Sequence, residues 1–221
     1  MDFDFSPLSE NWRFFADGLG VTVALSIASA AGSIVLGLAI ALLRLYGPRR
    51  VACLLIFYID TMRAVPLLVV LVWIYFAFPI LAGVTFPPFW AALTALTLHI
   101  AAYAAEVIRA GIESVRPGQM RAGLALGLSR MQIVRKVILP QATIRMLPAF
   151  GSILTIAIKD TAVATVIAVP ELLHKAEAVA GQSYRNIEVY TAVMIMYFML
   201  LFPVTRGVDR LYQRLAHRGR S

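Results

Sequence analysis

Five ionisable residues interrupt the long apolar stretches of this sequence, namely Asp60, Arg63, Glu106, Lys159 and Asp160. A charge in a hydrocarbon environment is costly, so such residues usually face protein or water and often mark a solute or ion pathway. The adjacent cation and anion at Lys159 and Asp160 could meet the carboxylate and ammonium of a zwitterion, or they could pair with each other. Asp60 and Arg63 lie three residues apart on one helical face, so they too could line a site or form a structural pair.

A proline places one of these charges beside a predicted helix break. Counted from Val51 at 1.5 Å per residue, Arg63 reaches roughly the middle of a membrane, and Pro66 should interrupt the helix just beyond it. Broken helices at this depth expose backbone groups and tend to line binding sites. We therefore predict a translocation path whose candidate residues are Arg63, Pro66, Tyr103, Glu106, Lys159, Asp160, Thr161 and Thr165.

His99, Tyr103 and Glu106 share one face of a predicted helix at spacings of four and three residues. A histidine and a carboxylate can suggest a metal, but two candidate ligands are too few, so no metal site is predicted. Glu106 is instead expected to pair with Arg109 or with a group on the second or fourth span. The sequence has no glycine-rich loop ending in Gly-Lys-Ser/Thr and no Gly-x-Ser-x-Gly elbow, so we expect no ATPase or other enzyme activity in this chain.

The elements that position these residues are predicted to be membrane helices. The chain has 221 residues and a mean hydropathy of +0.80, and its apolar runs approach the roughly 20 residues that cross a bilayer. We predict an all-α membrane protein with about five transmembrane helices. A single membrane domain covers 18–215, between an extracytoplasmic tail at 1–17 and a cytoplasmic tail at 216–221. The predicted spans are 18–43, 51–80, 88–110, 141–165 and 187–205.

The distribution of charge predicts the orientation of these spans. A net charge of +8 could indicate nucleic-acid binding, but insertion bias explains it better, because basic residues collect in cytoplasmic segments. Fifteen basic residues follow span one, surround the 113–140 insert or lie in the C-terminal tail, and only Arg13, Lys175 and Arg185 fall on the opposite side. The N-terminus is therefore expected outside, and the insert and the C-terminus in the cytoplasm.

The insert at about 113–140 is predicted to be a helix-turn-helix on the cytoplasmic membrane surface. Pro117 suits a first helical turn, Gly127 can end that helix, and Ser129 can cap the next one. Pro140 restricts the residue before it and is expected to mark the end of the insert.

Several motifs in one order resemble the permease subunits of bacterial ATP-binding-cassette (ABC) importers, in the polar amino-acid uptake branch (histidine/glutamine/glutamate type). The resemblance covers roughly 18–215. It rests on Arg63–Leu68, Ala102–Glu106, Gly111–Val115, Ala125–Gln141 and Lys159-Asp160-Thr161. The sequence departs from the family at Arg121-Ala122-Gly123, where the family pattern begins Glu-Ala-Ala.

The resemblance implies a type I importer permease fold, with the insert pressed against a partner ATPase. Its coupling residues would be Gln119, Arg121, Ala122, Leu126, Gly127, Leu128, Ser129 and Arg130. It further implies the bacterial inner (plasma) membrane, a second permease chain of the same or a sister type, two ATPase subunits that bind ATP and Mg²⁺, and an extracytoplasmic solute-binding protein. No cofactor is expected on this chain, and no nucleic acid is expected as a partner. The substrate would be a polar amino acid or a similar small zwitterion, with glutamate, glutamine, basic amino acids and ectoine all open.

Two other functions fit parts of the pattern. A self-sufficient secondary transporter or channel could use Glu106 or Asp160 as an ion site, but it would have no obvious use for the cytoplasmic helical insert. A membrane enzyme would need a nucleophile and a base, and the three histidines have no convincing partners.

Overall fold

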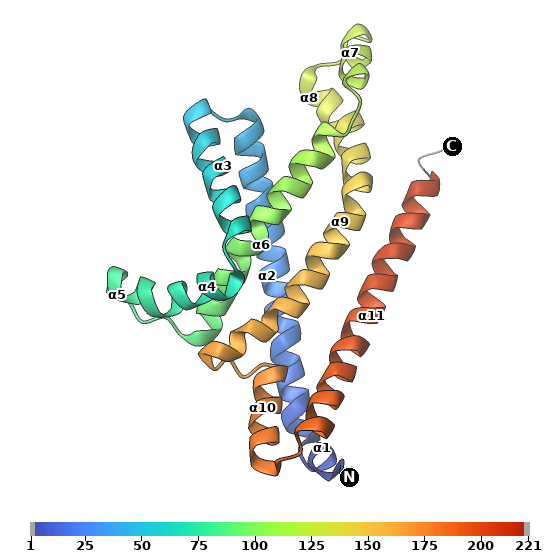
Figure 1. The fold of residues 1–221 in the computed structure, drawn as a ribbon. Coiled ribbons are helices and arrows are strands. Elements are labelled where there is room, and N and C mark those ends of the chain that lie inside the picture. The colour runs from blue at the N-terminus through green and yellow to red at the C-terminus, as the bar shows by residue number, and fades with distance from the viewer. Residues whose placement is uncertain (1–2, 219–221) are drawn as a thin grey trace.

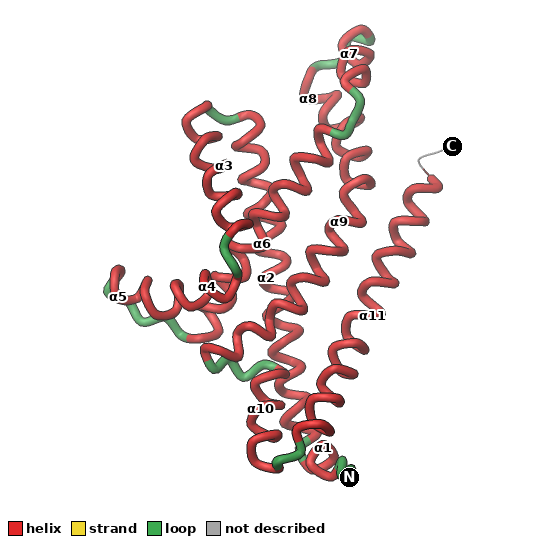
Figure 2. Tube along the Cα trace, in the orientation of Figure 1, coloured by secondary structure: helices red, strands yellow, loops and turns green. Residues whose placement is uncertain are grey.

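The computed structural model describes residues 3–218, and every regular element in this part of the chain is a helix (Figures 1 and 2). The elements run in the order α1 (Ser6–Glu10), α2 (Trp12–Tyr46), α3 (Arg49–Ala64), α4 (Leu67–Val72), η1 (Trp73–Ala77), α5 (Phe78–Ala82), α6 (Pro88–Glu113), α7 (Pro117–Ala125), α8 (Arg130–Ile133), η2 (Val134–Ile138), α9 (Leu139–Asp160), η3 (Thr161–Ile167), α10 (Leu172–Ser183) and α11 (Asn186–Arg218). Of these, η1 and η2 are π-helical turns and η3 is a 3₁₀ helix.

Four helical segments in the described residues are long and apolar enough to cross a membrane, and they contain four of the five predicted spans. They are Trp12–Tyr46, Pro88–Glu113, Arg130–Ile167 and Asn186–Leu215. The fifth prediction, a span at 51–80, corresponds to two helical stretches, Arg49–Ala64 and Leu67–Ala82, that meet at an angle of 109°. The bend lies at Pro66, as predicted, because proline offers no N–H and holds the preceding Val65 in an extended conformation (φ −86°, ψ 133°).

The predicted N-terminal tail is largely helical. Residues 12–17 belong to α2, and α1 precedes it. The reason is burial, because Phe15 is almost completely enclosed in a hydrophobic cluster with Leu172 and Val189, which lie near the opposite end of the sequence. At the C-terminus, 216–218 of the predicted tail continue α11, while 219–221, like 1–2, lie outside the described residues.

The central contact of the bundle is between α2 and α6. Both helices present small residues to each other, which lets two backbones approach closely within a membrane. The buried serine hydroxyls on α2 are satisfied by backbone carbonyl groups, and Ser33 Oγ, for example, lies 2.6 Å from Ser29 O and 3.2 Å from Thr97 O on α6. This pair forms the scaffold against which α3, α9 and α10 pack.

The insert projects from one end of the bundle, and its second helix is longer than predicted. In Figure 1, α7 and α8 lie at the top with the C-terminal end of α11, while the N-terminus and α10 lie at the bottom. Pro140 does not end the insert, because α8, η2 and α9 run on without a loop. The wider π turn of η2 ends two residues before Pro140 and relieves the clash that the proline ring would cause in a regular helix.

Candidate functional site

The structure brings Arg63 and Tyr103 together at the break in the second span. The guanidinium carbon of Arg63 lies 5.7 Å from the centre of the Tyr103 ring, within the range of a cation–π interaction. Asp60 lies one turn earlier, but no ion pair joins it to Arg63 within residues 3–218. The possible Asp60–Arg63 structural pair is therefore not formed, and the guanidinium keeps its hydrogen-bonding capacity.

The same break packs against the C-terminal end of the fourth span. Val65 and Leu67, on either side of Pro66, belong to one hydrophobic cluster with Val163 and Ile167 of η3. This contact places the exposed backbone of the break beside the segment that follows Asp160.

Lys159 and Asp160 close α9, and neither forms an ion pair in the described part of the chain. Lys159 is exposed and Asp160 is half-buried. The next candidate, Thr161, is fully buried, and its hydroxyl donates to Ile158 O at 2.8 Å.

Thr165 is tied to α10 by residues that the sequence reasoning did not single out. Its hydroxyl donates to Glu177 Oε2 at 2.7 Å and lies 3.3 Å from His174 Nδ1. The i, i+3 spacing of His174 and Glu177 could have indicated a shared helical face, but nothing in the sequence pointed to Thr165 as their partner.

Glu106 is held by two guanidinium groups. Its Oε2 accepts from Arg109 at 2.7 Å, as predicted, and its Oε1 accepts from Arg44. The second partner therefore comes from the end of span one and not from span two or four, because the C-terminal end of α2 lies against α6. Arg109 extends the chain of charges to Glu113 at 2.5 Å. This network compensates the Glu106 carboxylate within the chain.

His99 shares the helical face predicted for it, and its ring centre lies 5.5 Å from that of Tyr103. Its buried Nδ1 has no hydrogen-bond partner within the described residues. In the same part of the chain, no three His, Cys, Asp or Glu side chains come close enough to hold a metal.

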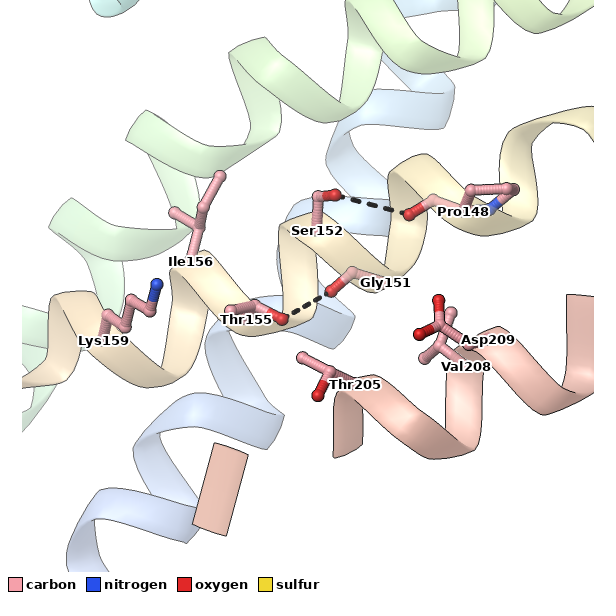
Figure 3. Close-up of a pocket in the computed structure, with 9 residues that line it drawn as sticks. All are labelled: Pro148, Gly151, Ser152, Thr155, Ile156, Lys159, Thr205, Val208 and Asp209. Carbon is pink, nitrogen blue, oxygen red and sulfur yellow. Dashed lines mark hydrogen bonds between the residues drawn. The ribbon is translucent and has the colours of Figure 1, made fainter. Parts of the chain in front are cut away.

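A cavity of about 380 Å³ lies between α9 and α11 (Figure 3). Small and hydroxyl-bearing residues dominate its lining, and Lys159 and Asp209 add one charge of each sign. The full lining is Pro148, Gly151, Ser152, Thr155, Ile156, Lys159, Thr205, Val208 and Asp209. All three hydroxyls are bound to carbonyls of their own helix, since Ser152 donates to Pro148 O at 3.4 Å, Thr155 to Gly151 O at 3.0 Å and Thr205 to Phe202 O at 2.9 Å. The cavity can therefore admit a small polar solute.

A buried carboxylate that the sequence reasoning missed fixes the bottom end of the bundle. Glu171 is fully buried and accepts from the N–H groups of Leu173 (3.0 Å) and His174 (2.7 Å) and from the Tyr197 hydroxyl (3.0 Å). Burial raises the pKa of this carboxyl, and the hydrogen bonds oppose that rise. Its position directly before α10 is an N-cap signal, although glutamate is not a preferred cap.

The turn of the insert has the predicted local geometry. Gly127 adopts the left-handed conformation (φ +75°) that follows a helix end, and Ser129 caps α8. The cap is a reciprocal capping box, in which Ser129 Oγ accepts from Gln132 N at 3.3 Å and Gln132 Oε1 accepts from Ser129 N at 2.8 Å.

The predicted coupling residues are mostly exposed, as a docking surface requires. Leu126 is 79% exposed at the tip of the insert, an unusual position for a large apolar residue. Gln119, Arg121, Ala122, Gly127, Ser129 and Arg130 are also exposed, and Leu128 is half-buried.

The departure from Glu-Ala-Ala at its third position has a packing reason. A Cβ on Gly123 would lie 2.6 Å from Ile133 Cγ1, so alanine would fit only if the Ile133 side chain or one of the two helices moved. The insert is also secured at its base, where the Arg145 guanidinium of α9 donates to the Ser114 carbonyl at the end of α6.

Comparisons with known proteins agree with this architecture. A family model described as the inner membrane component of binding-protein-dependent transport systems matches residues 9–220. The glutamine transport system permease protein GlnP of Escherichia coli (strain K12) is 33% identical over 216 residues, which cover 97% of this chain and 99% of the relative. The arginine transport system permease protein ArtQ of Bacillus subtilis (strain 168) is 32% identical over 213 residues, covering 95% and 97%.

Solved structures show the same fold. The crystal structure of an amino acid ABC transporter with histidines matches with a TM-score of 0.90 at 32% identity, covering 97% of this chain and 100% of that chain. The MetNI methionine ABC transporter matches with a TM-score of 0.79 at 21% identity, covering 93% and 98%, which shows the shared fold. ATP hydrolysis in this family is carried out by separate subunits. The helical bundle thus has the fold of a known group of importer permeases, and the chain belongs to the family of inner-membrane permease components of binding-protein-dependent (ABC) transport systems.

Proposed function

We propose that this permease carries a polar amino acid, or a similar small zwitterion, from the outer side of the inner membrane to the cytoplasm. The observation that carries the proposal is the set of charges at depth without an ion-pair partner in the described residues: Arg63 at the Pro66 break, and Lys159 and Asp160 at the end of α9. A guanidinium or ammonium group matches a substrate carboxylate, and a carboxylate matches a substrate ammonium group.

Names of relatives support the same substrate class. GlnP and ArtQ are described as glutamine and arginine permeases, so the relatives as a group handle polar amino acids of different side chains. A site that binds the α-carboxylate and α-ammonium groups suits this pattern, because these two groups are common to all amino acids. The side chain would then be accommodated elsewhere along the path, where the hydroxyl-lined cavity between α9 and α11 is one candidate.

The assembly proposed here has a second permease chain, two ATPase subunits that bind ATP and Mg²⁺, and a solute-binding protein outside. The exposed turn of the insert, with Leu126 at its tip, is the surface proposed to contact the ATPase. The orientation proposed has the N-terminus and α10 outside and the insert and the C-terminal end of α11 inside, since the fifteen basic residues counted in the sequence would then face the cytoplasm.

Uptake by the complete complex, reconstituted in vesicles with its ATPase and binding protein, tests the proposal. A panel of labelled amino acids should include at least one that is accumulated on addition of ATP. Asp160→Asn should impair that uptake while the ATPase still co-purifies, and Asp17→Asn, which removes an exposed carboxylate at the outer end of α2, should leave uptake unchanged. Uptake by Asp160→Asn at normal apparent affinity would show that Asp160 lies outside the path.

A further inference from the structure

A second and almost purely apolar groove lies on another face of the bundle, between α2, α6 and the η2–α9 helix. Its volume is about 370 Å³. Apart from Thr143 and the ring of Tyr46, the side chains that line it are aliphatic, Met or Phe, and the Thr143 hydroxyl is turned to its own helix, where it donates to Leu139 O at 2.8 Å. The groove therefore offers nothing to a polar substrate, which separates it from the translocation path.

The groove has the length of one membrane leaflet. On α2 its lining runs from Ile34 to Tyr46, and on the opposite wall from Val134 to Phe150. The twelve residues of the α2 wall rise about 18 Å, and one leaflet contributes about 15 Å of hydrocarbon, which is half of the bilayer core. The groove thus extends from the interface at the insert-bearing end of the bundle to about mid-membrane.

Its α2 wall is a stripe of apolar residues four positions apart that the bundle leaves partly uncovered. Leu38 and Leu42 are 43% and 39% exposed, although both line the groove. The stripe continues to Tyr46, an amphipathic ring of the type found at membrane–water interfaces. An occupant that follows this stripe is extended and apolar, and it reaches water beside Tyr46.

The interfacial end of the groove carries positive charge. Arg135 follows the lining residue Val134 and lies one turn before the lining residue Leu139, on the insert side of the groove. It is exposed and forms no ion pair within residues 3–218. Basic groups at this level of a membrane protein attract anionic headgroups, by about 1 kcal/mol for each Lys or Arg.

From these observations we infer that the groove between α2, α6 and α9 binds one acyl chain of an anionic phospholipid, with its headgroup beside Arg135 and Tyr46. Length, apolar lining and a cationic mouth match this occupant together. A helix of a second permease chain would give no reason for the cation at the end of the groove. The bound chain would fill the gap between the α2–α6 scaffold and the helix that carries the insert.

Photo-crosslinking tests the inference on the complete complex, purified with its ATPase. Vesicles of phosphatidylethanolamine are doped with phosphatidylglycerol or phosphatidylcholine, either of which carries a diazirine on one acyl chain, and labelled peptides are identified by mass spectrometry. Labels are expected on the groove-lining segments of α2 and α9, and about fivefold more from phosphatidylglycerol than from phosphatidylcholine, the ratio that about 1 kcal/mol gives.

Two pairs of variants separate the groove from the general lipid surface. Leu38→Trp fills the groove and should reduce the α2 and α9 labels to background, whereas Val35→Trp, on the same helix but 71% exposed and outside the groove lining, should not. Arg135→Gln should abolish the preference for phosphatidylglycerol, whereas Arg210→Gln, on α11, should preserve it. If Leu38→Trp fails to assemble, Thr143→Trp blocks the groove from its other wall.

Three outcomes would overturn the inference. Equal labelling of Leu38→Trp and Val35→Trp would show general lipid contact without a site. Equal labelling by both lipids in the unaltered complex would show that the groove does not select an anionic headgroup. A disulfide between two permease chains, formed by cysteine at position 38, would show that the groove is an interface between permeases.

Discussion

Replacing Gly127 by aspartate tests whether the turn of the insert transmits force from the ATPase. The cost within the chain follows from the structure. At φ +75° a residue with a Cβ is strained by about 1 kcal/mol, and a Cβ at this position would meet nothing within 4 Å. The insert lies beyond the apolar spans, so membrane insertion of Gly127→Asp should be nearly normal.

The cost at the proposed ATPase contact is larger. A carboxylate buried without a partner at an interface costs about 2 kcal/mol or more, which corresponds to about a 30-fold loss of affinity. We therefore expect that Gly127→Asp either loses the ATPase on co-purification in detergent or retains it with ATP hydrolysis uncoupled from uptake. Gly118→Asp is the matched control. It adds the same charge to the same insert, at the first turn of α7, where a Cβ also meets nothing within 4 Å and φ is not positive.

The assay compares the amount of ATPase recovered with a tagged permease and the ratio of ATP hydrolysed to substrate transported. A Gly127→Asp complex with normal recovery and a normal ratio would mean that the insert is not the element that transmits force. Loss of the variant from the membrane would instead refute the small internal cost worked out above.

Three further predictions concern other parts of the chain. Arg44→Gln and Glu106→Gln should each lower the apparent Tm by several degrees, because each leaves a partly buried charge with a missing partner. The double variant should lower the Tm by less than the sum of the two single effects. Strict additivity of the Tm changes would show that the pair is not coupled. Burial raises the folded-state pKa of Glu171 above its unfolded value. The contribution of the protonated Glu171 carboxyl to the stability of the fold is therefore present at acidic pH and is lost as pH rises through the folded pKa. The apparent Tm of the unaltered protein should therefore fall across that window relative to Glu171→Gln, and parallel curves for the two proteins would contradict this assignment. A cysteine at Ser129 should react with a membrane-impermeant thiol reagent only from the cytoplasm and one at Ser183 only from outside, and the reverse pattern would refute the proposed orientation.

Features that depend on neighbouring residues were predictable from the sequence. The left-handed Gly127, the Ser129 cap and the bend at Pro66 each follow from the backbone preferences of one or two residues. The span positions follow from hydropathy in the same local way. In these cases the membrane and the bundle do not compete with the local preference, so the prediction and the structure agree.

Features that depend on distant partners could not be predicted. The Arg44 partner of Glu106 lies 62 positions away, and Glu171 is held by Thr22 and Tyr197 from the first and last spans. Each of these contacts depends on how the helices pack, and a single sequence does not indicate which helices are in contact. The start of α2 shows the same effect, since burial of Phe15 against α10 extends the helix beyond its apolar run.

The wrong prediction at Pro140 bears most directly on mechanism. A boundary there would have separated the insert from the fourth span by a hinge. Instead, η2 absorbs the proline, and helix continues from Arg130 to Asp160, about 45 Å at 1.5 Å per residue. One helix therefore joins Arg130, which follows the Ser129 cap, to Asp160, the carboxylate proposed to meet the substrate. A displacement of the turn by the ATPase would reach Asp160 along this helix, in which η2 and Pro148 are the two places where it can bend. The Arg145–Ser114 contact would carry part of the same displacement into α6.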